Sequence, residues 1–222
     1  MSSTTEINIL AITANSLKAR EYEQIFPEYY ALATITENGL WHDNQNVLDH
    51  VIAVFAGLEK VLQFASLASS HKNSLENYLS QRIGTKTRRE ILIVATLLHD
   101  IAKIDTLVNR ADGTANCPGH EMIGAARVKI FSERFDLSKK DEDYVEWIVR
   151  YHGFISEILG LILVNRTKEK YLQIFKETVG DVALELVLLM HADLLGSDLA
   201  RTDKKAYDDR IEILDWMVEQ LQ

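Results

Sequence analysis

Apolar residues recur at three- and four-residue steps along most of the chain, the spacing of one face of an α-helix. The stretch 45–64 shows this most clearly, at Val47, Val51, Val54, Phe55, Leu58, Val61 and Leu62. Segments 88–104 and 181–200 are apolar on nearly all sides and predict buried helices. The β-branched residues of segment 88–104 leave a strand as an alternative to a helix there. The pattern predicts an all-α domain.

Several other segments also carry helical signals. A helix is predicted from about Glu121, and another from a serine cap at Ser138 to an end at Gly153. A short apolar segment (155–164), an amphipathic stretch (167–179) and a closing helix (205–221) follow. Residues 1–40 are less regular: "INILAI" fits a strand and "LKAREYEQIF" a helix, and one or two helices are favoured. We expect 1–40 to pack as a helical extension on a main domain, 41–222.

Composition narrows the class of protein. The chain has 222 residues, 47% of them hydrophobic and only two of them proline, which suits one packed helical domain. Its net charge of -9 argues against an extended nucleic-acid-binding surface. No uninterrupted apolar run approaches the roughly 18 residues of a membrane span, and the first residues lack a basic signal region. These features predict a cytoplasmic protein with no membrane contact, in which the single cysteine, Cys117, is incidental.

The histidines and two of the aspartates carry the chemical signal. Among the seven histidines, His71 lies in a polar stretch and is expected to be exposed, and His191 is expected to point into packing. The remaining candidates lie beside or at the ends of apolar stripes, where an unpaired carboxylate would cost several kcal/mol. Singly each has an ordinary structural explanation, but together they could satisfy one another around divalent metal. They are His50, His99, Asp100, His120, His152 and Asp193.

The order of these residues, with the motif "LLHDIAK", resembles the HD-domain superfamily of metal-dependent phosphohydrolases. That family's motif is "LLHDIGK", so Ala102 stands where glycine is usual. "GHEMIGAARV" and "LSKKDEDYVEWIVRYHG" resemble the HD domains attached to tRNA nucleotidyltransferases and related phosphohydrolases. The resemblance covers about 41–200 and implies a helical bundle with a central metal site.

The resemblance also implies ligand roles. His50, His99, Asp100 and Asp193 would hold a first metal ion, and Asp100 would bridge to a second held by His120 and His152. It therefore implies two divalent ions per chain, drawn from Mn, Fe, Zn, Ni and Mg. The activity implied is attack on phosphorus by metal-activated water, with a small phosphorylated substrate, a nucleotide being one candidate.

Three residues are the main candidates for catalysis beside the metals, and a fourth is a weaker one. Asp100 would bridge the ions, and Lys103, one turn beyond His99, would contact phosphate or serve a structural role. Arg127 is a weaker candidate for the same contact. His42 would protonate the leaving group or contact the substrate, or else pack near a helix start. The irregular segment 108–119 is expected to shape the pocket.

Two other functions remain open at this point. Some proteins with the HD fold and the same order of six ligands are diiron oxygenases. A non-catalytic domain that binds metal or nucleotide is the other alternative.

Overall fold

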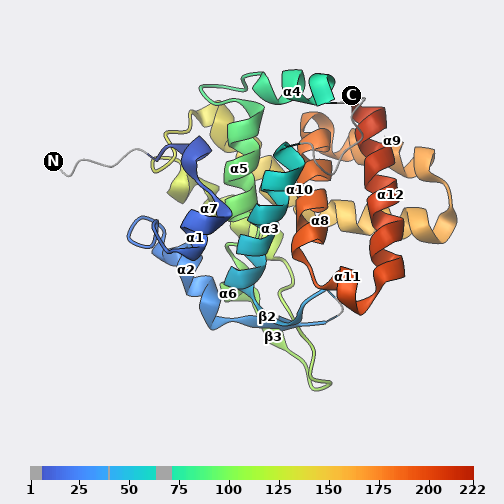
Figure 1. Ribbon diagram of the computed structural model, residues 1–222, viewed down its shortest axis with the longest axis horizontal. Coiled ribbons are helices and arrows are strands. Elements are labelled where there is room, and N and C mark those ends of the chain that lie inside the picture. The colour runs from blue at the N-terminus through green and yellow to red at the C-terminus, as the bar shows by residue number, and fades with distance from the viewer. Residues whose placement is uncertain (1–6, 40, 64–71) are drawn as a thin grey trace.

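The computed structural model describes residues 7–39, 41–63 and 72–222. Helices dominate this part of the chain and form a bundle, which confirms the predicted all-α class (Figure 1). The α-helices are α1 (Ala14–Lys18), α2 (Pro27–Ala31), α3 (Val47–Leu62), α4 (Lys72–Ser80), α5 (Arg88–Leu98), α6 (Lys103–Thr106), α7 (His120–Phe131), α8 (Lys139–Asn165), α9 (Lys168–Val179), α10 (Ala183–Gly196), α11 (Leu199–Thr202) and α12 (Lys204–Leu221). Short 3-10 helices are η1 (Ile9–Ala11), η2 (Leu32–Thr34) and η4 (Gly180–Val182).

A small antiparallel sheet, which the sequence did not predict, lies at one end of the bundle (Figure 1). Its strands are β1 (Thr36–Asn38), β2 (Asp43–Asn46), β3 (Val108–Asn109) and β4 (Ala115–Asn116), in the order β2-β1-β4-β3. The β1–β4 pairing, Asn38 opposite Ala115, joins the N-terminal region to the segment between α6 and α7.

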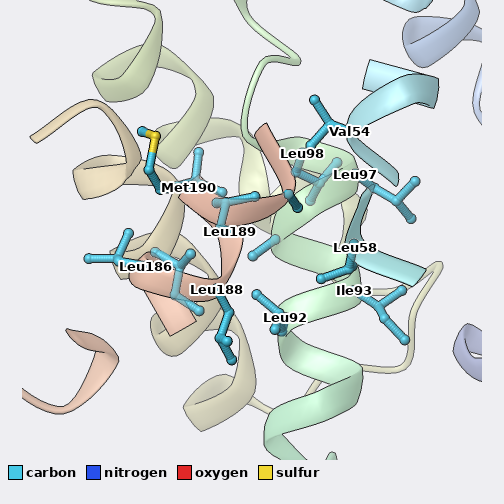
Figure 2. Close-up of a cluster of buried hydrophobic side chains, with 14 of the residues drawn as sticks. Val54, Leu58, Leu92, Ile93, Leu97, Leu98, Leu186, Leu188, Leu189 and Met190 are labelled. Carbon is cyan, nitrogen blue, oxygen red and sulfur yellow. The ribbon is translucent and has the colours of Figure 1, made fainter. Parts of the chain in front are cut away.

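The core lies where α3, α5 and α10 meet (Figure 2). Side chains from all three helices interdigitate there, and those labelled in the figure are Val54, Leu58, Leu92, Ile93, Leu97, Leu98, Leu186, Leu188, Leu189 and Met190. Burial of these apolar groups is the main favourable contribution to folding. The predicted stripes of 45–64 and 181–200 are confirmed as the buried faces of α3 and α10.

Helices α3 and α10 cross closely because glycines stand at their contact. A Cβ atom at Gly57 would lie 2.6 Å from the backbone oxygen of Ala192. A Cβ atom at Gly196 would lie 2.4 Å from the backbone nitrogen of Val54. Glycine at both positions therefore permits the close approach of α3 and α10, the helices that carry His50 and Asp193.

Gly57→Ala should lower the free energy of unfolding by roughly 1–3 kcal/mol, because the added methyl group overpacks a backbone contact. Gly160→Ala in α8 is the matched control, since nothing lies within 4 Å of a Cβ there. The control should stabilise by about 0.5–1 kcal/mol through helix propensity. Chemical denaturation of both variants measures the difference, and equal effects would rule out the close packing.

The segment 88–104 is not one helix. It begins with a capping box between Thr87 and Glu90, as a helix rather than the alternative strand, but α5 ends at Leu98. Turn hydrogen bonds follow, from the Ile101 amide to the Leu98 carbonyl (3.2 Å) and from the Lys103 amide to the Asp100 carbonyl (3.0 Å). The prediction of a continuous helix was wrong at this turn, which carries His99 and Asp100.

Helix α8 corrects a second boundary. Ser138 forms the predicted cap, but Gly153 does not end the helix, which runs from Lys139 to Asn165 through the apolar segment 155–164. A Cβ atom at Gly153 would lie 2.7 Å from Oε1 of Glu121, so this glycine permits close packing against α7. Of the helices in the described ranges, α8 is the one whose length and apolar composition would allow a membrane crossing.

The N-terminal part packs on the core through α1 against α3 and η1 against α5. "INILAI" forms η1 rather than a strand, and α1 and α2 are short helices. A division between extension and main domain at residue 40 stays a prediction.

Buried Asp141 in the first turn of α8 anchors the loop before α5. Its carboxylate accepts hydrogen bonds from the Gly84 amide (2.8 Å), the Thr85 amide (2.9 Å) and the Ser138 amide (3.0 Å). Burial raises the pKa of Asp141, but hydrogen bonds from Ser138 and Thr85 outweigh it and lower the pKa to about 2.

The depressed pKa predicts a pH-dependent contribution to stability. The carboxylate stabilises the fold fully above the unfolded-state pKa of about 3.9 and loses this contribution as the pH falls to about 2. Asp141→Asn should therefore be less stable than wild type by about 2 kcal/mol at pH 7, with the difference shrinking between pH 4 and pH 2. Urea denaturation across that range tests it, and a pH-independent difference would contradict it.

Candidate metal centre

The six predicted ligands line one cavity of about 500 Å³. His50 comes from α3, His99 and Asp100 from the turn after α5, and Asp193 from α10. His120 opens α7, and His152 lies in the middle of α8. Five segments far apart in the sequence thus contribute to one site, and His50, His99 and Asp100 are each 2% exposed.

One half of the site is formed by His50, His99, Asp100 and Asp193. Nε2 of His50 lies 3.1 Å from Oδ1 of Asp193 and 3.7 Å from Oδ2 of Asp100. Nε2 of His99 lies 3.3 Å from Oδ2 of Asp100. Ligand atoms of His50, His99 and Asp100 all lie within 4.8 Å of one another, as one metal ion requires.

The other half is formed by Asp100, His120 and His152. Oδ1 of Asp100 lies 3.1 Å from Nε2 of His120 and 3.7 Å from Nε2 of His152. These three residues form a second cluster within 4.8 Å. The two oxygens of Asp100 therefore face different clusters, which is the arrangement of a bridging carboxylate.

The imidazole rings are oriented for metal binding. In three of them Nδ1 lies 2.6–2.7 Å from the backbone carbonyl three residues earlier, and these are His99, His120 and His152. Such a contact places the proton on Nδ1 and turns the Nε2 lone pair toward a metal. Nε2 of His120 and Nε2 of His152 lie only 3.1 Å apart, so two lone pairs face each other when both rings are neutral and carry the proton on Nδ1. The buried Nε2 of His99 makes no hydrogen bond within the described residues. A cation would satisfy all three nitrogens, so the donor set fits divalent metal.

The electrostatics of the site favour positive charge. Burial raises the pKa of Asp100, but the opposing effects of His99 and Lys103 hold it well below its usual range. Burial likewise raises the pKa of Asp193, and His50 lowers it to about 2. Burial lowers the pKa of His99 and of His120, yet Asp100 outweighs it and raises both. Two ionised carboxylates thus remain in a buried site.

Comparison with known proteins agrees with this geometry. The family model of the HD domain matches residues 47–198, which include all six predicted metal ligands. The chain belongs to the HD domain family. Proteins of this family are mostly metal-dependent hydrolases. The match therefore supports the prediction of an HD domain suited to metal-dependent hydrolysis.

Curated relatives of this HD domain chain are bifunctional uridylyltransferase/uridylyl-removing enzymes. That of Ruegeria pomeroyi is 27% identical over 135 residues, 60% of this chain and 13% of the relative. Those of Hydrogenovibrio crunogenus and Aromatoleum aromaticum are 27% and 28% identical over 159 residues, 69% of this chain and 15% and 17% of the relatives. The chain thus spans less than a fifth of the length of these relatives.

Lys103 reaches the HD cavity from the first residue of α6 and is buried. Its ammonium lies 2.9 Å from Oδ2 of Asp100 and 2.5 Å from Oε2 of Glu37. Burial lowers the pKa of Lys103, but these carboxylates outweigh it and raise the pKa above its ordinary value. The ammonium is therefore permanently charged beside the metal ligands.

His42 also lines the cavity, with its ring centroid 4.3 Å from that of His50. Burial, and the charges of His50 and Lys103, lower the pKa of His42 to about 4. A neutral ring suits a hydrogen bond to substrate better than proton donation at neutral pH, so the leaving-group role is the weaker of the two functional roles predicted for His42. Arg127 does not line the cavity and pairs instead with Asp105 at 2.5 Å.

Sequence reasoning missed the residues that the sheet brings to the cavity. Glu37 of β1 is 7% exposed and lies against Lys103, and Asn38, Ala115, Asn116 and Cys117 line the same wall. The segment 108–119 thus shapes the pocket as predicted, and Cys117, dismissed as incidental, lies within it. No local motif marks Glu37, because a pairing across the chain places it there.

The remaining histidines lie elsewhere. His191 is buried, and its Nε2 contacts Oδ1 of Asp215 at 2.9 Å, away from the cavity lining, in agreement with the predicted packing role. His71 falls outside the described residues.

Proposed function

We propose that this HD domain chain is a metal-dependent phosphohydrolase that cleaves a phosphomonoester or phosphodiester. The observation that carries the proposal is the convergence of four imidazoles on two clusters that share Asp100. Asp193 lies 3.1 Å from His50, and the Lys103 ammonium lies 2.9 Å from Asp100. Mixed nitrogen and oxygen ligands suit Mn, Fe, Zn and Ni, and carboxylates also suit Mg.

The two clusters of donor atoms support two divalent ions per chain. His50, His99, Asp100 and Asp193 would hold one ion, and Asp100, His120 and His152 would hold the other. When bound, such ions lower the pKa of a coordinated water molecule to about 7 and neutralise negative charge on phosphoryl oxygens.

The chain's own groups supply the rest of the chemistry. Lys103 presents a fixed positive charge that stabilises negative charge on the phosphoryl group, and Glu37 holds its ammonium in place. His42 offers a neutral ring nitrogen for a hydrogen bond to substrate. Residues of β1 and β4 line one side of the cavity.

A small phosphorylated substrate is the proposed partner, with a nucleotide as the leading candidate. The relatives support this choice, since their name describes removal of a uridylyl group. The net charge of -9 supports a small ligand over extended nucleic acid.

Activity measurements test the proposal directly. Protein stripped by a chelator should hydrolyse no phosphoester, and addition of Mn²⁺, Fe²⁺, Zn²⁺, Ni²⁺ or Mg²⁺ should restore hydrolysis of at least one monoester or diester. Absence of hydrolysis with every metal, together with substrate-dependent oxygen uptake by the iron form, would favour the diiron oxygenase instead.

A further inference from the structure

The cavity contains more negative charge than its proposed metal ligands require. Besides Asp100 and Asp193 it is lined by the carboxylates of Glu37 and Glu121, and neither glutamate belongs to a metal-binding cluster of the described residues. Every lysine and arginine of the chain lies within the described ranges, and Lys103 is the one that lines the cavity. Four carboxylates and one ammonium give the lining of the cavity a net charge of about minus three.

Each glutamate is positioned by a neighbouring residue. Glu37 is buried and paired with Lys103, so the one ammonium available to a phosphoryl group is accompanied by a negative charge. Glu121 follows His120 in the first turn of α7, where its side chain is 28% exposed. Its Oε1 occupies the space that a side chain at Gly153 would fill, which places the carboxylate over the His152 side of the cavity.

Three arginines on helices near the cavity are already paired with carboxylates. Their ion pairs, each within 2.8 Å, are Arg127–Asp105, Arg150–Glu146 and Arg201–Asp43. A second phosphate group would therefore find no lining arginine or lysine to bind it, although such bidentate or point-charge contacts are the usual phosphate ligands.

The charge balance identifies a substrate class. Two divalent ions would bring the charge of the cavity from about minus three to about plus one, and a hydroxide formed from metal-bound water would bring it to about zero. Each negative charge on the substrate beyond the first is then increasingly unfavourable, and a phosphodiester carries only one. A phosphomonoester at pH 7 carries a charge of about −1.5 to −2, and polyphosphates carry more. We propose that Glu37 and Glu121 make this cavity selective for a phosphodiester over phosphomonoesters and polyphosphates. This inference rests on the proposed phosphohydrolase function and narrows its substrate.

Two chromogenic esters with the same leaving group test the selectivity. With the metal that supports turnover, kcat/KM for bis(p-nitrophenyl) phosphate should exceed that for p-nitrophenyl phosphate by at least about tenfold. Glu121→Lys should reduce this ratio by about tenfold and Glu121→Gln by about threefold, since opposite charges several ångströms apart still interact at the effective dielectric of a protein surface. Glu177→Lys on α9, whose glutamate is exposed and absent from the cavity lining, is the control and should leave the ratio unchanged.

Binding gives a second readout that does not depend on turnover. Calorimetry should show that wild type binds uridine diphosphate no more tightly than uridine monophosphate, whereas Glu121→Lys should bind the diphosphate about tenfold more tightly than wild type does. Elemental analysis must show equal metal content in the variants compared. An unchanged ester ratio in Glu121→Lys, or tighter binding of the diphosphate by wild type, would overturn the inference while hydrolysis still stood. If no ester is cleaved with any metal, the proposed function fails, and the binding comparison still decides the charge selectivity.

Discussion

Replacing Asp100 by alanine is expected to remove both metal ions and to reduce phosphoester hydrolysis by at least about a thousandfold. Asp100 is 2% exposed, and its two oxygens face the two separate clusters of imidazoles. Without Asp100, each cluster loses one ligand, and with it the negative charge that the two clusters share. Elemental analysis and turnover of the same preparation measure both effects.

Two comparison variants make the Asp100 result specific. His152→Ala should lose the second ion and keep the first, because His152 belongs only to the cluster with His120 and Asp100. His191→Gln should keep both ions, since His191 is buried on the same helix as Asp193 but contacts Asp215. Full metal content in Asp100→Ala would show that the bridging assignment is wrong.

Replacing Lys103 by methionine is expected to lower kcat by roughly 10²–10³-fold while metal content stays near that of wild type. The side chain keeps its unbranched apolar stem and loses the ammonium that lies 2.9 Å from Asp100 and 2.5 Å from Glu37. That charge would stabilise the phosphoryl oxygens as negative charge develops on them. Steady-state kinetics with elemental analysis of the same samples measures the effect.

The Lys103 prediction also separates catalysis from structure. Lys103→Arg keeps the positive charge and should retain more activity than Lys103→Met. Removal of the ammonium leaves Glu37 and Asp100 buried with one fewer partner, so some loss of stability is expected as well. A kcat for Lys103→Met within threefold of wild type, with metal bound, would leave Lys103 a structural ion-pair residue only.

Much of the metal centre could be predicted from the sequence because its ligands lie on strongly periodic helices. His50 lies beside the stripe of α3, and Asp193 continues the buried stripe of α10, so their positions follow from helical geometry. The motif around His99 and Asp100 indicated the HD-domain family. The clustering of all six residues in one cavity agrees with that prediction, while their role as ligands stays a prediction that metal analysis tests.

What the sequence did not reveal depends on contacts between distant segments. Glu37 reaches the cavity because β1 pairs with β4, through Asn38 and Ala115, and neither strand has a local pattern long enough to predict. Gly153 was misread as a helix end because glycine usually marks one, whereas here it makes room for Glu121. The turn after Leu98 was missed because apolar periodicity continues through Ile101 and Ala102, both buried.

Metal stoichiometry tests the central claim, a shared site for two divalent ions, most directly. Protein purified without a metal-binding tag, then reconstituted and freed of excess metal, should contain about two ions of Mn, Fe, Zn, Ni or Mg per chain. One ion per chain would leave His120 and His152 to serve the substrate and would remove the bridging role of Asp100. No bound ion after reconstitution with any of these metals would contradict the metal centre itself.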